Sequence, residues 1–194
     1  MLDTHGRRFV QPLIKKVADI FIKFGFSANQ VTILAFILGM SVGLFVYFDF
    51  ILISIILLWI SGLLDAVDGT VARLRKMTST FGTLMDITFD RLVEIGMILA
   101  LALKHSEHMF LFLLLACSII ITMTVFLTVG SLSNKKSEKS FYYQAGFAER
   151  TEGFIFFSGM IIFESYAYLI CLAFTIAILF TAMQRMNEAK RILD

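Results

Sequence analysis

Long apolar runs limit what this chain can fold into more than any other feature of its sequence. Six such runs follow one another, at residues 31–48, 51–73, 80–103, 109–130, 147–163 and 166–183. A helix needs about 20 apolar residues to cross a hydrocarbon core roughly 30 Å thick. The run at 147–163 is the least clean, because Glu149, Arg150 and Glu152 stand near its start. The sequence predicts an all-α polytopic membrane protein with six transmembrane helices.

Composition agrees with this class and excludes others. The chain is 58% hydrophobic and only 16% charged, and its formal net charge is +2. A soluble domain of this length needs more charge on its surface. A nucleic-acid-binding protein carries a strong positive balance, so no nucleic-acid partner is expected.

The basic residues predict how the chain crosses the membrane. Fifteen of the 17 Lys and Arg residues fall in the N-terminal segment, around the loops after the second and fourth runs, or after the sixth run. Basic residues favour the cytoplasmic side of short loops. We therefore expect an integral protein of the cell membrane with both termini on the cytoplasmic side.

The first 26 residues differ from the rest of the chain. Between Phe9 and Phe24, apolar residues recur at intervals of three and four, with Lys15, Lys16 and other cations between them. This pattern predicts an amphipathic helix on the inner membrane face, although a helix docked on the protein itself would show the same pattern. We expect an amphipathic juxtamembrane helix at residues 1–26 and one six-helix membrane domain at residues 27–194.

Charged side chains inside the predicted spans are concentrated in the hairpin of the second and third helices. They are Asp65, Asp68, Arg73, Asp86, Asp90, Arg91 and Glu94. Charge inside a span is costly, and by default it marks function. The connection between the two helices is short, so their acidic ends are expected to be antiparallel neighbours on the cytoplasmic side.

The spacing of the aspartates places them on two stripes. At about 100° per residue, Asp65 and Asp68 share one side of their helix, and Asp86 and Asp90 lie one turn apart on the next. Four carboxylates in a low dielectric need protons or a compensating cation. Hard oxygen ligands suit Mg²⁺, Mn²⁺ or Ca²⁺ better than zinc, and four carboxylates can bridge two ions that clamp a phosphoryl group.

Three other interpretations stay open on the residues alone. The aspartates could form interhelical ion pairs, for instance with Arg91, but two basic residues do not neutralise so many acids. An ion or solute transporter would also use acids inside the membrane, although no inverted repeat is visible. A catalytically silent scaffold is the third interpretation.

The acidic residues and their neighbours carry a family resemblance. The pattern is Asp65-x-x-Asp68-Gly69-x-x-Ala72-Arg73, then eight residues, then Gly82-x-x-x-Asp86-x-x-x-Asp90. It resembles the signature DxxDGxxAR…GxxxDxxxD of the CDP-alcohol phosphotransferases, also called class I CDP-alcohol phosphatidyltransferases. The resemblance implies transfer of a phosphatidyl group from CDP-diacylglycerol, or a similar CDP-lipid, to a small alcohol, with release of CMP. It also implies a homodimer.

The resemblance assigns roles by position. It implies that Asp65, Asp68, Asp86 and Asp90 bind two divalent cations, Mg²⁺ or Mn²⁺, and that Asp90 is also the catalytic base. The residues that it implies in contact with the CDP-lipid are Asn29, Gly69, Arg73 and Ser79. Asn29 stands in Ala28-Asn29-Gln30-Val31-Thr32, which looks like the family's Pro-Asn-x-x-Thr with Ala28 in place of proline.

Three basic residues are candidates for binding the acceptor alcohol. Lys135, Lys136 and Arg150 are expected on the same side of the membrane as the acidic pocket, where they would suit a phosphorylated acceptor. Ordinary positive-inside charge is the alternative for the two lysines. The stretch Glu149-Arg150-Thr151-Glu152 looks like the Glu-Arg element of members that use inositol phosphate. We expect inositol phosphate as the acceptor, with glycerol 3-phosphate, the acceptor of phosphatidylglycerophosphate synthases, as the second candidate.

Overall fold

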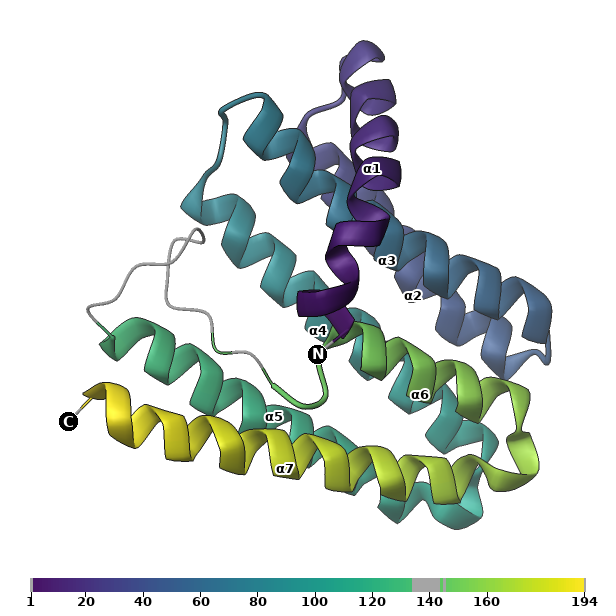
Figure 1. Cartoon of the computed structure of the whole chain (residues 1–194). Helices are drawn as coiled ribbons and strands as arrows, with labels where there is room; N and C mark the ends of the chain where they lie inside the picture. The colour runs from purple at the N-terminus through teal and green to yellow at the C-terminus, as the bar shows by residue number, and fades with distance from the viewer. Residues whose placement is uncertain (1, 134–143, 145, 194) are drawn as a thin grey trace. The chain divides into compact units, whose positions relative to one another are not determined.

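The computed structural model describes residues 2–133, 144 and 146–193, and these residues form helices joined by short connections (Figure 1). The helices are α1 (Leu2–Lys23), α2 (Ala28–Tyr47), α3 (Ile51–Leu74), α4 (Thr80–Lys104), η1 (Ser106–His108), α5 (Met109–Leu132), α6 (Arg150–Ile162), η2 (Glu164–Tyr166) and α7 (Ala167–Leu193). Their contacts divide the chain into two compact units, Gly6–Lys104 and the remainder. The predicted all-α fold is confirmed for the described residues.

Among the described residues, four helical stretches are long and apolar enough to cross a membrane. They are Ala28–Tyr47, Ile51–Leu74, Ser106–Leu132 and Glu164–Leu193. The other two predicted spans differ in kind. The helix α4 has the length but carries the acidic residues, and α6 has only 13 residues, or about 20 Å of helix. The predicted fifth helix is shorter than expected because it begins only at Arg150, so six crossings stay a prediction.

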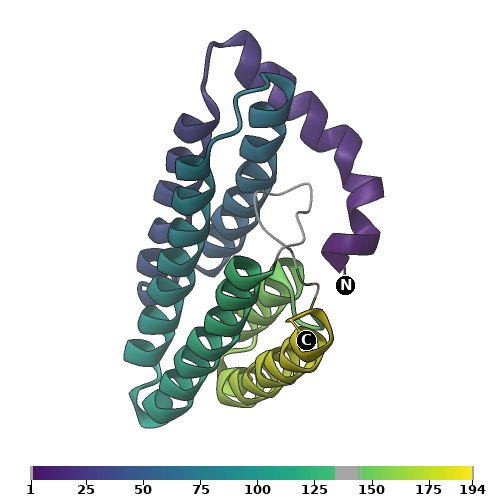
Figure 2. The ribbon, with the colours of Figure 1, turned by 90° about the vertical axis from the view of Figure 1, so that its left-hand side faces the viewer.

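The helix α2 organises the first unit, since it packs against both α3 and α4. Glycine allows this close packing. A Cβ atom built on Gly39 would lie 2.6 Å from a Val93 methyl and 2.7 Å from the Ser61 hydroxyl, and one on Gly43 would lie 2.9 Å from the Gly96 carbonyl oxygen. The two acidic helices therefore make their main backbone contacts with α2 rather than with each other. Figure 2 shows α2, α3 and α4 as long neighbouring rods.

Replacing Gly43 by alanine should destabilise the first unit. The added methyl group meets the backbone of α4, which cannot turn aside as a side chain can, so we expect a loss of about 1–3 kcal/mol in the free energy of unfolding. The matched control is Gly159→Ala in α6, where the nearest atom would lie at an ordinary 3.6 Å and helix propensity improves. Thermal unfolding in detergent should show a lower midpoint for Gly43→Ala alone. Equal midpoints would contradict the packing argument.

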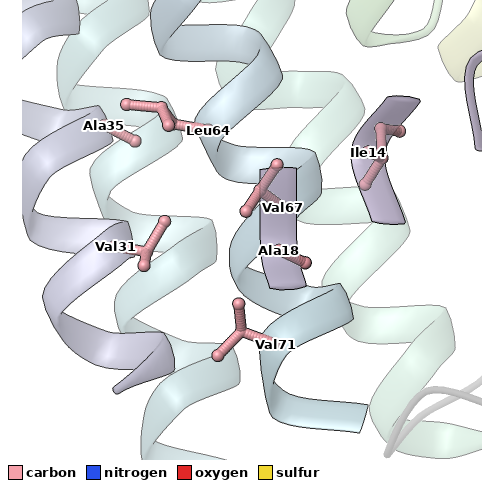
Figure 3. Packing of buried hydrophobic residues seen from close by; sticks show 7 residues of the cluster. All are labelled: Ile14, Ala18, Val31, Ala35, Leu64, Val67 and Val71. Atoms are coloured by element: carbon pink, nitrogen blue, oxygen red, sulfur yellow. The ribbon is translucent and has the colours of Figure 1, made fainter. Parts of the chain in front are cut away.

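The N-terminal helix α1 is formed, and one of its sides is docked on α2 and α3. Ile14 and Ala18 are buried, and they share one apolar cluster with residues of α2 and α3 (Figure 3). The other members of this cluster are Val31, Ala35, Leu64, Val67 and Val71. Elsewhere on α1, Leu13 is exposed, and so is Phe24 just after the helix ends, with 53% and 77% of their surface accessible. Part of the apolar side of α1 thus serves packing, and its place at a membrane surface stays a prediction.

The second unit is built on α7, which packs against α5 and α6. A buried arginine lies in its interior. The guanidinium group of Arg185 stands 4.7 Å from the Phe126 ring centre and 3.5 Å from the Thr122 hydroxyl. The buried amide of Gln144 donates to the Arg185 carbonyl at 3.1 Å, so residues just before α6 are tied to α7. Figure 2 shows α5, α6 and α7 gathered in this unit.

Candidate active site

The last turns of α3 bring two aspartates into the interior of the first unit. Asp68 is buried and Asp65 is half-buried. Val67 and Val71 of the same helix are fully buried in the cluster that α3 shares with α1 and α2. Because these apolar contacts set the rotation of α3 about its axis, they also set the direction in which the two carboxylates leave it.

The third carboxylate comes from the start of α4. The Ser79 hydroxyl accepts a hydrogen bond from the backbone N–H of Gly82 at 2.9 Å, as a helix N-cap does. Asp86 follows one turn later, and it supplies a carboxylate oxygen that lies within 4.8 Å of those of Asp65 and Asp68. The backbones of α3 and α4 pack mainly against α2, and their acidic side chains converge from the two helices.

This group of three fits a hard divalent cation. Its donors are all carboxylate oxygens, which is the donor set that Mg²⁺ and Mn²⁺ prefer. Asp90 lies one turn further along α4, is half-buried, and stands outside the 4.8 Å group. The described residues therefore gather ligands for one cation, and a second cation shared with Asp90 stays a prediction.

A threonine with no role predicted from the sequence is bonded to this group. The Thr32 hydroxyl of α2 donates to Oδ2 of Asp68 at 2.5 Å, and both residues are buried. Thr32 ends the Asn29-Gln30-Val31-Thr32 stretch, so the sequence contained a signal for it. Nothing in helical periodicity connects it with Asp68, because the two residues lie 36 positions apart.

Two residues expected to contact the nucleotide, Asn29 and Ser79, both lie beside Gly82 near the start of α4. A Cβ atom built on Gly82 would lie 3.0 Å from the Ser79 hydroxyl and 3.3 Å from Oδ1 of Asn29. Asn29 reaches this place from the first turn of α2, which begins after an N-cap at Ser27. The small Gly82 thus allows a close approach of two polar side chains from separate helices.

The other two expected contacts, Gly69 and Arg73, lie one turn apart on α3. A Cβ atom on Gly69 would lie 3.3 Å from Nη1 of Arg73, so the guanidinium group lies alongside the glycine. Arg73 is exposed and donates from Nη2 to the Thr70 hydroxyl at 3.1 Å. An exposed cation beside a residue without a side chain is accessible to an anionic group of a ligand.

Arg91 and Glu94 of α4 form an ion pair within the helix. Nη1 of Arg91 lies 2.6 Å from Oε2 of Glu94, one turn further on. Arg91 is thus engaged with Glu94, rather than offered by itself to the aspartates of α3.

Of the three candidate acceptor residues, the structure describes only Arg150, which belongs to the second unit. Lys135 and Lys136 lie outside the described residues. Arg150 is the first residue of α6, and its guanidinium group stands 5.5 Å from the centre of the Phe154 ring. Its neighbours Glu149 and Glu152 form a capping box that fixes the start of the helix.

The apolar helices are those of an integral membrane protein, and the converging aspartates form a partly buried group that can hold a divalent cation. The chain belongs to the CDP-alcohol phosphatidyltransferase family, whose sequence model matches residues 26–184. This confirms the predicted family and the predicted class of enzyme, a transferase of phospholipid synthesis, and it does not favour the transporter interpretation.

Relatives support the same family. The chain is 31% identical to the inner membrane protein YnjF of Escherichia coli over 171 residues, 81% of this chain and 80% of that protein. It is 32% identical over 97 residues to a phosphatidylinositol phosphate synthase of Corynebacterium glutamicum, a match that covers 48% of this chain and 43% of the synthase.

The fold is also that of a solved enzyme, the phosphatidylinositol phosphate synthase of Mycobacterium tuberculosis. Its structure with manganese and citrate superposes with a TM-score of 0.76 at 19% identity, over 91% of this chain and 88% of the other. Its structure with CDP-DAG bound gives 0.75 at 18% identity, over 92% and 94%.

Proposed function

We propose that this protein transfers a phosphatidyl group from CDP-diacylglycerol, or a similar CDP-lipid, to inositol phosphate and releases CMP. The observation that carries the proposal is the convergence of three aspartates of the family pattern within 4.8 Å. The acceptor is supported by the relatives, two of which are phosphatidylinositol phosphate synthases. Glycerol 3-phosphate is the second candidate acceptor.

In the proposed reaction, the acceptor oxygen bonds to the phosphorus that carries the lipid. The bond from this phosphorus to the bridging oxygen breaks, and CMP leaves with the electron pair. The acceptor hydroxyl gives its proton to a carboxylate oxygen of Asp90, the general base. Bound Mg²⁺ or Mn²⁺ supplies positive charge to the diphosphate. We propose that Asp65, Asp68, Asp86 and Asp90 hold two such cations.

The remaining roles are assigned by the same reasoning. Arg73 neutralises diphosphate charge, and Gly69 leaves room for the nucleotide beside it. Asn29, from the first turn of α2, and Ser79, from the start of α4, hold the cytidine side of the donor, since both lie beside Gly82. Lys135, Lys136 and Arg150 bind the phosphate of the acceptor.

The proposed arrangement in the membrane completes this picture. The helices α4 and α6 cross together with the four more apolar stretches, which makes six crossings in a domain of residues 27–194. Residues 1–26 lie on the cytoplasmic face with the exposed apolar side chains of α1 in the lipid interface. Both termini and the active site face the cytoplasm, and two chains form a homodimer.

A panel of acceptors tests the proposed function. Purified protein, radiolabelled CDP-diacylglycerol and Mg²⁺ or Mn²⁺ are incubated with inositol phosphate, glycerol 3-phosphate, serine or inositol, and the lipid product is identified. We expect phosphatidylinositol phosphate as the main product, with the other acceptors slower by about tenfold or more, as expected when buried polar groups lose their partners. A faster reaction with glycerol 3-phosphate would reassign the acceptor. If no acceptor gave a new lipid product with release of CMP, the proposed reaction would be contradicted.

A further inference from the structure

The contact between Thr32 and Asp68 joins two helices at the acidic site. The Thr32 hydroxyl has two acceptors within reach, Oδ2 of Asp68 at 2.5 Å and the Ala28 carbonyl at 3.1 Å. A hydroxyl carries one proton, so it donates fully to only one of them. The charged acceptor at the shorter distance forms the stronger bond. The Thr32 hydroxyl therefore donates its hydrogen bond to the carboxylate of Asp68 rather than to the Ala28 carbonyl.

The surrounding structure holds this hydroxyl in place. Val31, the residue before Thr32, is fully buried. One turn further along α2, the Ala35 carbonyl accepts a hydrogen bond from the Ser61 hydroxyl of α3 at 2.8 Å, which is a second link between the same two helices. At the start of α2, Ser27 and Gln30 form a reciprocal capping box. A side chain on a capped, tightly packed helix keeps its position, and so does the carboxylate bonded to it.

We propose that Thr32 is a positioning residue for the cation site: its hydroxyl holds one oxygen of Asp68 so that the carboxylate stays aligned with Asp65 and Asp86. The inference rests on the proposed cation-dependent function. A neutral donor suits this task, because it orients a carboxylate without cancelling the charge that attracts a cation. Hydrogen bonds of this kind to metal ligands are worth about 10- to 100-fold in metal affinity or activity.

The same placement couples the two halves of the site. Asn29, on the nucleotide side, precedes Thr32 by three residues on α2. One rigid helical turn therefore carries both the side chain beside Gly82, at the start of α4, and the side chain bonded to Asp68 of α3. A change at Thr32 should accordingly weaken cation binding first and affect the donor lipid through the cation.

The test compares Thr32→Val, Thr32→Ala and Thr32→Ser with a matched control in the second unit. Thr175 of α7 is also buried, and its hydroxyl donates to the carbonyl four residues earlier, Cys171, at 2.9 Å. Thr175→Val therefore loses the same local bond but no carboxylate contact. The affinity for Mn²⁺ is measured by electron paramagnetic resonance on the purified, substrate-free protein, and kcat and KM for CDP-diacylglycerol are measured at several Mn²⁺ concentrations.

We expect Mn²⁺ affinity to fall about 10- to 100-fold in Thr32→Val and Thr32→Ala, and to stay near the wild-type value in Thr32→Ser and Thr175→Val. Excess Mn²⁺ should restore much of the lost CMP release. If valine disrupts packing, as judged by thermal unfolding, the alanine variant decides the question. Unchanged Mn²⁺ affinity in a folded Thr32→Ala, or an equal loss in Thr32→Ser, would overturn the inference. If the wild-type protein bound Mn²⁺ but released no CMP, the proposed function would be refuted but the role of Thr32 would not. The comparison of Mn²⁺ affinities would still decide that role.

Discussion

Replacing Asp90 by asparagine should lower the rate of CMP release by about 10²- to 10⁴-fold, the range that a positioned general base contributes. The substitution keeps the size and shape of the side chain but removes its capacity to accept the proton of the acceptor hydroxyl. Because Asp90 lies outside the group formed by Asp65, Asp68 and Asp86, the variant should still bind at least one Mn²⁺ ion. Radiolabelled CDP-diacylglycerol with a saturating acceptor measures the rate.

The control for this variant is Asp19→Asn, which changes an exposed carboxylate on α1. It should leave both the rate and Mn²⁺ binding unchanged. Wild-type turnover in Asp90→Asn would exclude Asp90 as the base. Loss of all Mn²⁺ binding in that variant would instead show that Asp90 is essential to the first cation site.

Asparagine at Asp68 or Asp86 should have a different primary effect, the loss of the cation. Each substitution removes one negative charge from a group of three carboxylates whose oxygens lie within 4.8 Å of one another. Divalent cations depend on such charge for their affinity, so we expect Mn²⁺ binding to weaken by about 100-fold or more and activity to fall with it. Electron paramagnetic resonance of bound Mn²⁺ and CMP release are measured on the same preparations.

The stability of Asp86→Asn should also depend on whether the cation is present. With no cation present, removing one of several neighbouring negative charges relieves repulsion, so the thermal midpoint of Asp86→Asn should equal or exceed that of the wild type. Added Mn²⁺ should raise the midpoint of the wild type, because it binds the folded state, and should raise that of the variant much less. A variant with full Mn²⁺ affinity would show that the three carboxylates are not the ligands.

The secondary structure was predictable where the apolar runs are long and uninterrupted. The helix expected at residues 51–73 forms at Ile51–Leu74, and the one expected at 80–103 forms at Thr80–Lys104. The exception is the run expected at 147–163. Its first residues are used as a cap, since Glu149 accepts a hydrogen bond from Gly146 at 3.1 Å and the helix starts after it. Hydropathy does not distinguish a capping segment from the first turn of a span.

The site was predictable only in part, because a sequence pattern does not contain the geometry that brings side chains together. A pattern of residues four apart places Asp86 and Asp90 on one side of α4, but it does not say which of them reaches across to α3. The role of Ser79 as the cap of α4 depends on local backbone geometry that a motif does not contain. The signature identified the residues that belong to the site, and the packing of α2 against its neighbours decided which of them meet.

Three properties can be recognised in the sequence without a structure: the chain is helical, its apolar segments suit a membrane, and its few internal charges form the signature of a phosphotransferase family. These properties follow from composition and from the period of a helix, both of which are local. The convergence of Asp65, Asp68 and Asp86, and the hydrogen bond from Thr32 to Asp68 36 positions away, became visible only in the three-dimensional fold. Such contacts depend on how buried valines and glycines set the rotation and spacing of whole helices, which no single segment encodes.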